Sequence, residues 1–132
     1  MQNLVASEAL VAALKYEAGQ VDMHMRADLD RLALQLDSRL LDVLDYGLFN
    51  GGKRIRPLLV VLASRLCGTG NEGAYRLGCA FEYLHAATLF HDDIIDNSAT
   101  RRGKASVHLK FGVIEAIRCD LRDQKLDAND SI

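Results

Sequence analysis

One stretch of the sequence, from Ala74 to Asp96, has the length and composition of a single central α-helix. It contains no proline and is apolar almost all round, and the whole chain of 132 residues has one proline, Pro57. A helix that is hydrophobic on every side is stable in water only when other elements cover it. We therefore predict an all-α fold, in which this helix lies within an array of antiparallel helices.

Apolar residues recur at helical spacing in several further segments, which end at glycine, proline or a helix-capping residue. Residues 58–67 are apolar enough for a buried helix or a strand, and the flanking Pro57 and Gly68 favour a helix. Gly19 separates the first two segments, and 68–73 is predicted to be a loop. The predicted helices are 4–16, 21–34, 37–47, 58–67 and 104–117.

Composition limits the class of protein. The chain is 49% hydrophobic with a formal net charge of −2, so no strongly basic surface indicates nucleic-acid binding. Cys67, Cys79 and Cys119 lack metal-ligand spacing and are odd in number, which predicts reduced thiols and a cytoplasmic location. We expect neither a transmembrane segment nor a leader peptide. Residues 1–117 are predicted to be the N-terminal part of one domain, and the highly charged residues 118–132 a divergent polar tail.

Three carboxylates, Asp92, Asp93 and Asp96, follow one another within a turn at the end of the central helix. Each helical residue turns by about 100°, so all three are predicted to face the same way. Such acids repel one another unless a cation joins them. Mg²⁺ prefers oxygen ligands and usually takes one or two protein carboxylates, leaving positions for water and substrate phosphate. The spacing therefore predicts a magnesium site.

The second motif is GGKRIRP, from Gly51 to Pro57. Its glycines let the backbone approach a ligand, and Lys53, Arg54 and Arg56 are expected just ahead of a helix N-terminus, which favours anions. Each motif alone is also consistent with an ordinary turn, a solvated basic face or a solubilising acidic patch. Together they indicate a site for a diphosphate with magnesium.

These motifs carry a family resemblance. GGKRIRP at 51–57 and EYLHAATLFHDDIIDNSATRRGKASVHLKFG at 82–112 resemble the trans-polyprenyl diphosphate synthases, and the similarity is clear from Leu44 to Gly112. The resemblance implies the N-terminal portion of the isoprenoid synthase fold. It also implies a prenyltransferase that condenses isopentenyl diphosphate with an allylic diphosphate, in isoprenoid biosynthesis.

The resemblance assigns a role to each candidate residue. Lys53, Arg56, His85 and Arg102 would hold the diphosphate of isopentenyl diphosphate. The three aspartates, Asp92, Asp93 and Asp96, would bind Mg²⁺ that bridges to the allylic diphosphate, and Arg101 would contact that leaving group. Cations suit this task because ionisation of an allylic diphosphate leaves a heavily charged pyrophosphate. His91 is expected to be a structural partner rather than a ligand.

Small residues precede the acidic motif. In this fold the product is expected to grow alongside the central helix, so Ala87 and Thr88 would leave an open tunnel and a long product, as in octaprenyl-type synthases. Ordinary helix packing is the alternative reason for small residues here.

The resemblance is lost after about Ile117, and a second aspartate-rich motif is missing from the sequence. We expect a prematurely ended synthase with weak or no activity alone. One alternative is a subunit of a split or heteromeric synthase, and another is a non-catalytic diphosphate-binding module. Either way, apolar helix faces would stay exposed, which predicts self-association or a partner subunit.

Overall fold

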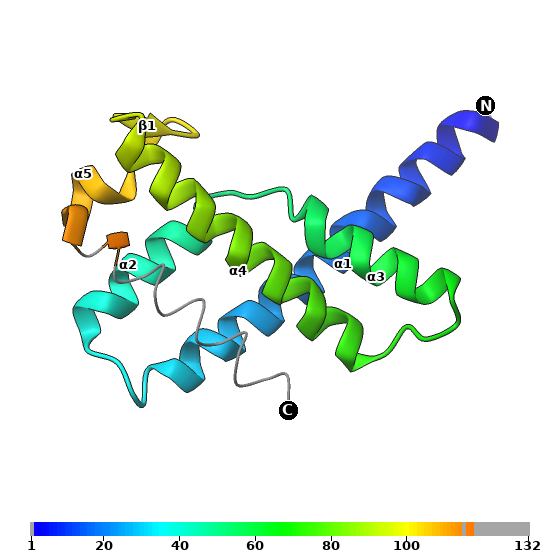
Figure 1. The fold of residues 1–132 in the computed structure, drawn as a ribbon. Coiled ribbons are helices and arrows are strands. Elements are labelled where there is room, and N and C mark those ends of the chain that lie inside the picture. Colours follow the sequence, from blue (N-terminus) through cyan, green and yellow to red (C-terminus); the bar gives the residue numbers. More distant parts are fainter. Residues whose placement is uncertain (1, 115, 118–132) are drawn as a thin grey trace.

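Helices make up most of the computed structural model, which describes residues 2–114, 116 and 117 (Figure 1). A two-stranded antiparallel hairpin precedes the last, short helix. The elements are α1 (Gln2–Leu32), α2 (Ser38–Leu48), α3 (Ile55–Leu66), α4 (Glu72–Ile95), β1 (Thr100–Arg101), β2 (Lys104–Ala105) and α5 (Val107–Phe111). The predicted all-α class is confirmed.

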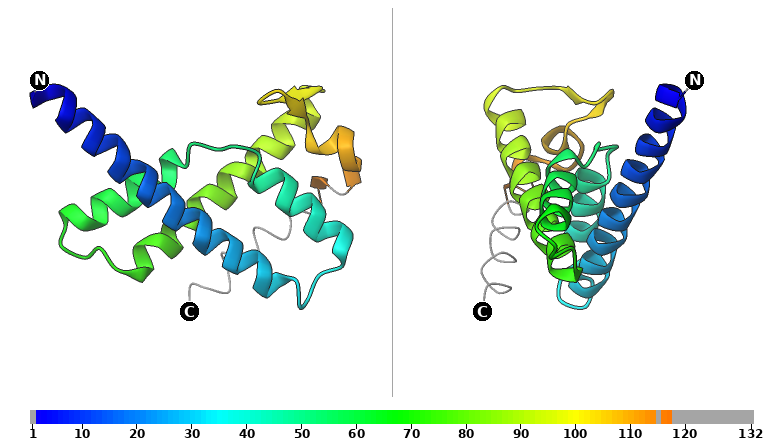
Figure 2. Two further views of the ribbon diagram at one scale, coloured as in Figure 1. Left: turned by 180° about the vertical axis from the view of Figure 1, so that it is seen from behind. Right: turned by 90° about the vertical axis from the view of Figure 1, so that its right-hand side faces the viewer.

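Helix α4 is the centre of the structure, because it contacts α1, α2, α3 and α5. The left view of Figure 2 shows α1 crossing α4, and both views show the N-terminal end of α1 projecting beyond the other helices. Residues 5–13 of that projecting end are all exposed. The core lies where α4 meets α2 and the C-terminal half of α1. Its buried members are Val21, Met25, Leu40, Val43, Leu44, Leu48, Cys79, Tyr83, Ala86, Phe90, Val107 and Ala116.

The first two predicted helices are one. The expected break at Gly19 is wrong, because α1 continues through it without interruption. Residues on both sides of the glycine are held by the rest of the molecule: Val21 is fully buried, and the buried Glu17 accepts a hydrogen bond from Tyr75. An interior glycine costs a helix about 1 kcal/mol, which such packing outweighs.

The predicted starts of α2 and α4 are close to those observed. Asp37 caps α2, and its Oδ1 accepts a hydrogen bond of 3.0 Å from the backbone N–H of Leu40. Helix α4 begins two residues before the predicted Ala74, at Glu72. Gly78 lets α3 approach α4 closely, because a Cβ there would lie 3.0 Å from Cβ of Pro57.

Two predicted helices have bounds that differ from those observed. The helix predicted over 104–117 starts later and is interrupted. Lys104 and Ala105 form strand β2, because the chain reverses at Arg102 and Gly103 to form the hairpin. Helix α5 covers Val107–Phe111, and residues 113, 114, 116 and 117 are helical again after Gly112. The helix favoured over 58–67 is present as α3, although it begins at Ile55. It is only partly buried, since Val61 is buried whereas Leu59 and Leu66 are exposed.

Two of the three cysteines lie among the described residues. Cys67 is exposed and Cys79 is buried, both are free thiols, and burial raises the pKa of Cys79 to about 12. Cys119 and the predicted polar tail at 118–132 lie outside the described residues. Among the helices that are described, none is both long and apolar enough to cross a membrane.

Candidate functional site

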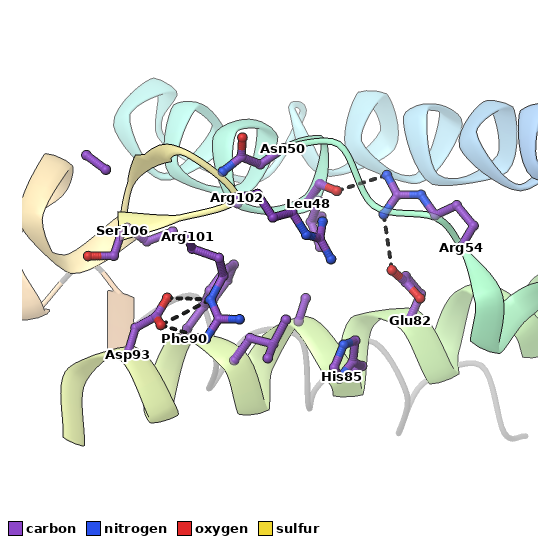
Figure 3. A pocket seen from close by; sticks show the side chains of 15 residues that line it. Leu48, Asn50, Arg54, Glu82, His85, Phe90, Asp93, Arg101, Arg102 and Ser106 are labelled. Atoms are coloured by element: carbon purple, nitrogen blue, oxygen red, sulfur yellow. Dashed lines mark hydrogen bonds and ion pairs between the residues drawn. The ribbon is translucent and has the colours of Figure 1, made fainter. Parts of the chain in front are cut away.

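A cleft of about 500 Å³, open mouth included, lies where four parts of the chain meet. Its walls are the end of α2, the loop before α3, the second half of α4 and the hairpin with the start of α5 (Figure 3). The polar side chains that line it are Asn50, Arg54, Glu82, His85, Asp93, Arg101, Arg102 and Ser106. Four of the predicted site residues, His85, Asp93, Arg101 and Arg102, are therefore brought together by the fold.

The basic loop, residues 51–54, enters the cleft through unusual backbone conformations. Gly51 has a φ of 79°, and Arg54, the residue before α3, has a φ of 54°, which is rare for a residue with a side chain. Lys53 and Arg56 are exposed and do not line the cleft itself. Arg56 lies in the first turn of α3 rather than ahead of it. The predicted basic triplet is thus split, with Arg54 buried between two exposed cations.

Arg102 reaches the basic loop from the opposite side of the cleft. It occupies the two-residue hairpin turn with Gly103, and both residues have a positive φ, as in a type I′ turn. Its Nη1 lies 3.2 Å from the position that a Cβ on Gly52 would take. Since Gly52 has no side chain, the guanidinium of Arg102 can approach the backbone of the basic loop.

His85 lies on α4 within this group of cations. Its pKa is lowered, first by burial and then by the positive charge of Arg56, with smaller contributions in the same direction from Arg102 and Arg101. The carboxylate of Glu82 opposes this shift. His85 is therefore predominantly a neutral imidazole at neutral pH, able to donate one hydrogen bond and accept another.

The three aspartates do not share one face, contrary to the prediction. Asp93 is 2% exposed and accepts hydrogen bonds of 2.7 to 3.0 Å from Nε and Nη2 of Arg101. That hydrogen bonding raises the pKa of Arg101, although burial opposes the shift. Asp93 turns inward because Arg101 of the hairpin lies on that side of α4. Asp92 and Asp96 remain exposed, one turn apart.

The exposed carboxylates fit a magnesium ion better than the full triplet does. Within the part of the chain that the structure describes, no three His, Cys, Asp or Glu side chains are grouped to hold a metal ion. Mg²⁺ commonly takes only one or two protein carboxylates and fills its other positions with water and phosphate oxygens. Asp92 and Asp96 could supply such a pair, with Asp93 acting on the site through Arg101.

Three further residues of the cleft were not found from the sequence. Glu82 precedes His85 by one turn and is a buried carboxylate, 6% exposed. The sequence does contain a signal for Glu82, because an acidic residue inside an apolar helix needs a cationic partner. Ser106 donates a 2.6 Å hydrogen bond to the carbonyl oxygen of Ser98. Oδ1 of Asn50 is buried and has no hydrogen-bond partner among the described residues.

Ala87 and Thr88, the two residues predicted to set product length, differ in burial. Ala87 is buried at 3% exposure, whereas Thr88 is exposed and donates a 2.7 Å hydrogen bond to the carbonyl oxygen of His85. The long-chain assignment stays a prediction.

Comparisons with known proteins bear on the same region. A family model described as polyprenyl synthetase matches residues 37–120. A geranylgeranyl diphosphate synthase of Sulfolobus acidocaldarius is 51% identical over 73 residues, which are 54% of this chain and 22% of that protein. An octaprenyl diphosphate synthase of Escherichia coli is 42% identical over 80 residues, 60% of this chain and 25% of that protein.

The fold is also shared with solved structures. A geranyltransferase from Legionella pneumophila superposes with a TM-score of 0.83 at 30% identity, covering 92% of this chain and 43% of that one. The chain spans between a fifth and a quarter of the length of the two curated relatives above.

Proposed function

Because the chain belongs to the polyprenyl synthetase family, we propose that it carries the diphosphate-binding part of a prenyltransferase. The enzyme would condense isopentenyl diphosphate with an allylic diphosphate to make a trans-polyprenyl diphosphate. The observation that best supports this function is the convergence of His85, Arg101 and Arg102 on one cleft, beside the exposed Asp92 and Asp96.

The cations of the cleft would divide the two diphosphates between them. Arg102, with His85 and the exposed Lys53 and Arg56, would hold the diphosphate of isopentenyl diphosphate and so place its alkene for attack. Arginine suits this role because its planar fork meets phosphate oxygens bidentately and keeps its charge. A neutral His85 would donate one hydrogen bond without adding a further charge among the guanidinium groups.

The allylic diphosphate would lie nearer the end of α4. Arg101, already oriented by Asp93, would contact the departing pyrophosphate and stabilise its negative charge. Asp92 and Asp96 would hold Mg²⁺, which when bound supplies charge that favours departure of the diphosphate.

Apolar side chains exposed on the surface of α4 indicate that further helices pack against it in the complete site. Leu77, Phe81 and Leu84 recur at helical spacing and are 54%, 48% and 43% exposed. A reaction through an allylic cation requires a cavity that excludes water, and this cleft is open. We therefore also propose that catalysis depends on additional polypeptide that covers α4, as part of a longer chain or as a separate subunit. Weak or absent activity alone, and a cytoplasmic location, stay predictions.

Calorimetric titration with pyrophosphate, in the presence of magnesium, tests the proposed binding role. We expect Arg102→Ala to weaken binding by about tenfold or more, because charge-assisted hydrogen bonds contribute about 1.5–3 kcal/mol each. Lys15→Ala on the projecting end of α1 removes the same charge and serves as the matched control. Equal binding by the two variants would contradict the proposed site.

A further inference from the structure

We infer that Arg54 and Glu82 are positioning residues, which anchor the basic loop against α4 in the geometry that diphosphate binding requires. This inference rests on the proposed function and adds two residues that the sequence motifs did not assign to substrate. It is based on the hydrogen bonds of Arg54, on the burial of Glu82 and on the packing around Gly52.

The buried guanidinium of Arg54 donates hydrogen bonds to three acceptors of the protein itself. Its side chain is 4% exposed, and its guanidinium donates to acceptors from three helices (Figure 3 shows two of them). Nε donates to Asp22 of α1 at 2.6 Å, Nη2 to the carbonyl oxygen of Leu48 in α2 at 2.9 Å, and Nη1 to Glu82 of α4 at 3.2 Å. A guanidinium bound in this way has little capacity left for a ligand, so Arg54 acts through the loop that it holds.

Glu82 is a negative charge inside a site that should attract anions. Its carboxylate is buried, lines the cleft and lies one turn before His85 on α4. A Cβ on Gly52 would lie 3.0 Å from Nη1 of Arg54, 3.2 Å from Nη1 of Arg102 and 3.5 Å from Oε1 of Glu82. Glu82 therefore offsets the repulsion between two guanidinium groups that the loop brings together.

The backbone conformation at Arg54 determines the directions in which the side chains of Lys53 and Arg56 extend from the loop. Arg54 adopts a left-handed conformation that a residue with a side chain rarely takes, so its position depends on the contacts of its guanidinium. Its carbonyl oxygen accepts the first helical hydrogen bond of α3, from Leu58 at 3.0 Å. Lys53 and Arg56 flank this point, so their orientation follows from the anchor.

The positioning role and a purely electrostatic role predict opposite effects for Glu82→Gln. This substitution keeps the shape of the side chain and removes one negative charge beside the cleft. If only charge mattered, an anion would bind more tightly to the variant. If Glu82 anchors Arg54 and the basic loop, the anion binds more weakly, although the site has become more positive.

The experiment is a calorimetric titration of the full chain with pyrophosphate and magnesium, using wild type, Glu82→Gln, Arg54→Lys and Arg65→Lys. Arg65→Lys is the matched control, because Arg65 also pairs with a buried carboxylate, Glu17 at 2.6 Å, without lining the cleft. We expect Glu82→Gln and Arg54→Lys each to weaken binding by about tenfold, as loss of a supporting partner does at other sites. Arg65→Lys should bind as wild type does. Circular dichroism would verify that each variant is folded.

Tighter or unchanged binding by Glu82→Gln would overturn the inference. If the wild type itself binds no pyrophosphate, the proposed function fails. The anchoring role of Arg54 and Glu82 is then tested on its own by amide hydrogen exchange. Faster exchange of the Leu58 amide in Arg54→Lys and Glu82→Gln, but not in Arg65→Lys, would support the anchoring role. Equal exchange in all four proteins would contradict it.

Discussion

At the level of single residues, the cleft contains arginines in two different states. Arg54 and Arg101 are held by buried carboxylates, Glu82 and Asp93, so much of their charge is already compensated. Arg102 is exposed at the turn of the hairpin. Anion affinity should therefore depend mainly on Arg102 and the other exposed cations, Lys53 and Arg56, whereas Arg54 fixes the shape of the site. Arg101 should contribute less to affinity than Arg102, because Asp93 already compensates its charge.

His85 provides a test of this environment through pH. Its pKa is lowered, chiefly by burial and then by Arg56. The pKa of a histidine in an unfolded chain is about 6.5. Between these two pKa values the unfolded chain binds more protons, so the free energy of unfolding falls as the pH is lowered. Urea unfolding at pH 7, 6 and 5 should show a steeper loss of stability in wild type than in His85→Asn. Equal pH dependence in the two proteins would contradict the shift.

At the level of elements, two glycines within helices have opposite roles. A Cβ on Gly47 of α2 would lie 2.2 Å from Cζ of Phe90, so the glycine makes room for the aromatic ring of α4. Gly19 of α1 has nothing within 4 Å of that position. The first glycine is therefore required by packing between helices, and the second is not.

Alanine at each glycine should change stability in opposite directions. Overpacking costs about 1–3 kcal/mol and helix propensity returns up to about 1 kcal/mol, so Gly47→Ala should destabilise the chain by about 1–2 kcal/mol. Gly19→Ala should stabilise it by about 0.5–1 kcal/mol. Chemical unfolding with the same denaturant measures both. Stabilisation by Gly47→Ala would show that the ring of Phe90 can move aside.

The elements also show which features could be predicted from the sequence. The starts of α2 and α4 follow local signals, such as the cap at Asp37. The continuity of α1 and the hairpin do not, because packing of the residues on either side of Gly19 keeps α1 helical and the turn uses Arg102 where Asn or Asp is more usual. For the site, the family resemblance assigned His85, Arg101 and Arg102 to bound diphosphates, and the three side chains line one cleft. They could not predict the inward turn of Asp93, which depends on a partner eight residues away in a different element.

At the level of the whole molecule, apolar residues on α3 and α4 remain in contact with water. Leu59 and Leu66 of α3 are 62% and 90% exposed, and three regularly spaced residues of α4, Leu77, Phe81 and Leu84, are about half exposed. Isolated apolar residues are normal at a surface, but a regularly spaced row on one helix favours association. The chain should therefore self-associate when no other polypeptide covers α4.

Light scattering coupled to size-exclusion chromatography tests this expectation over a range of concentrations. Wild type should show a mass above 14.6 kDa that rises with concentration, whereas the triple variant Leu77→Gln, Phe81→Glu and Leu84→Gln should approach the monomer mass. The matched control replaces Val5, Leu10 and Val11 with glutamine, since these side chains are at least as exposed but lie on the projecting end of α1. Because burial of apolar surface drives association in proportion to area, the control should still self-associate if α4 is the contact. A monomeric control together with an associated α4 variant would place the contact on α1 instead.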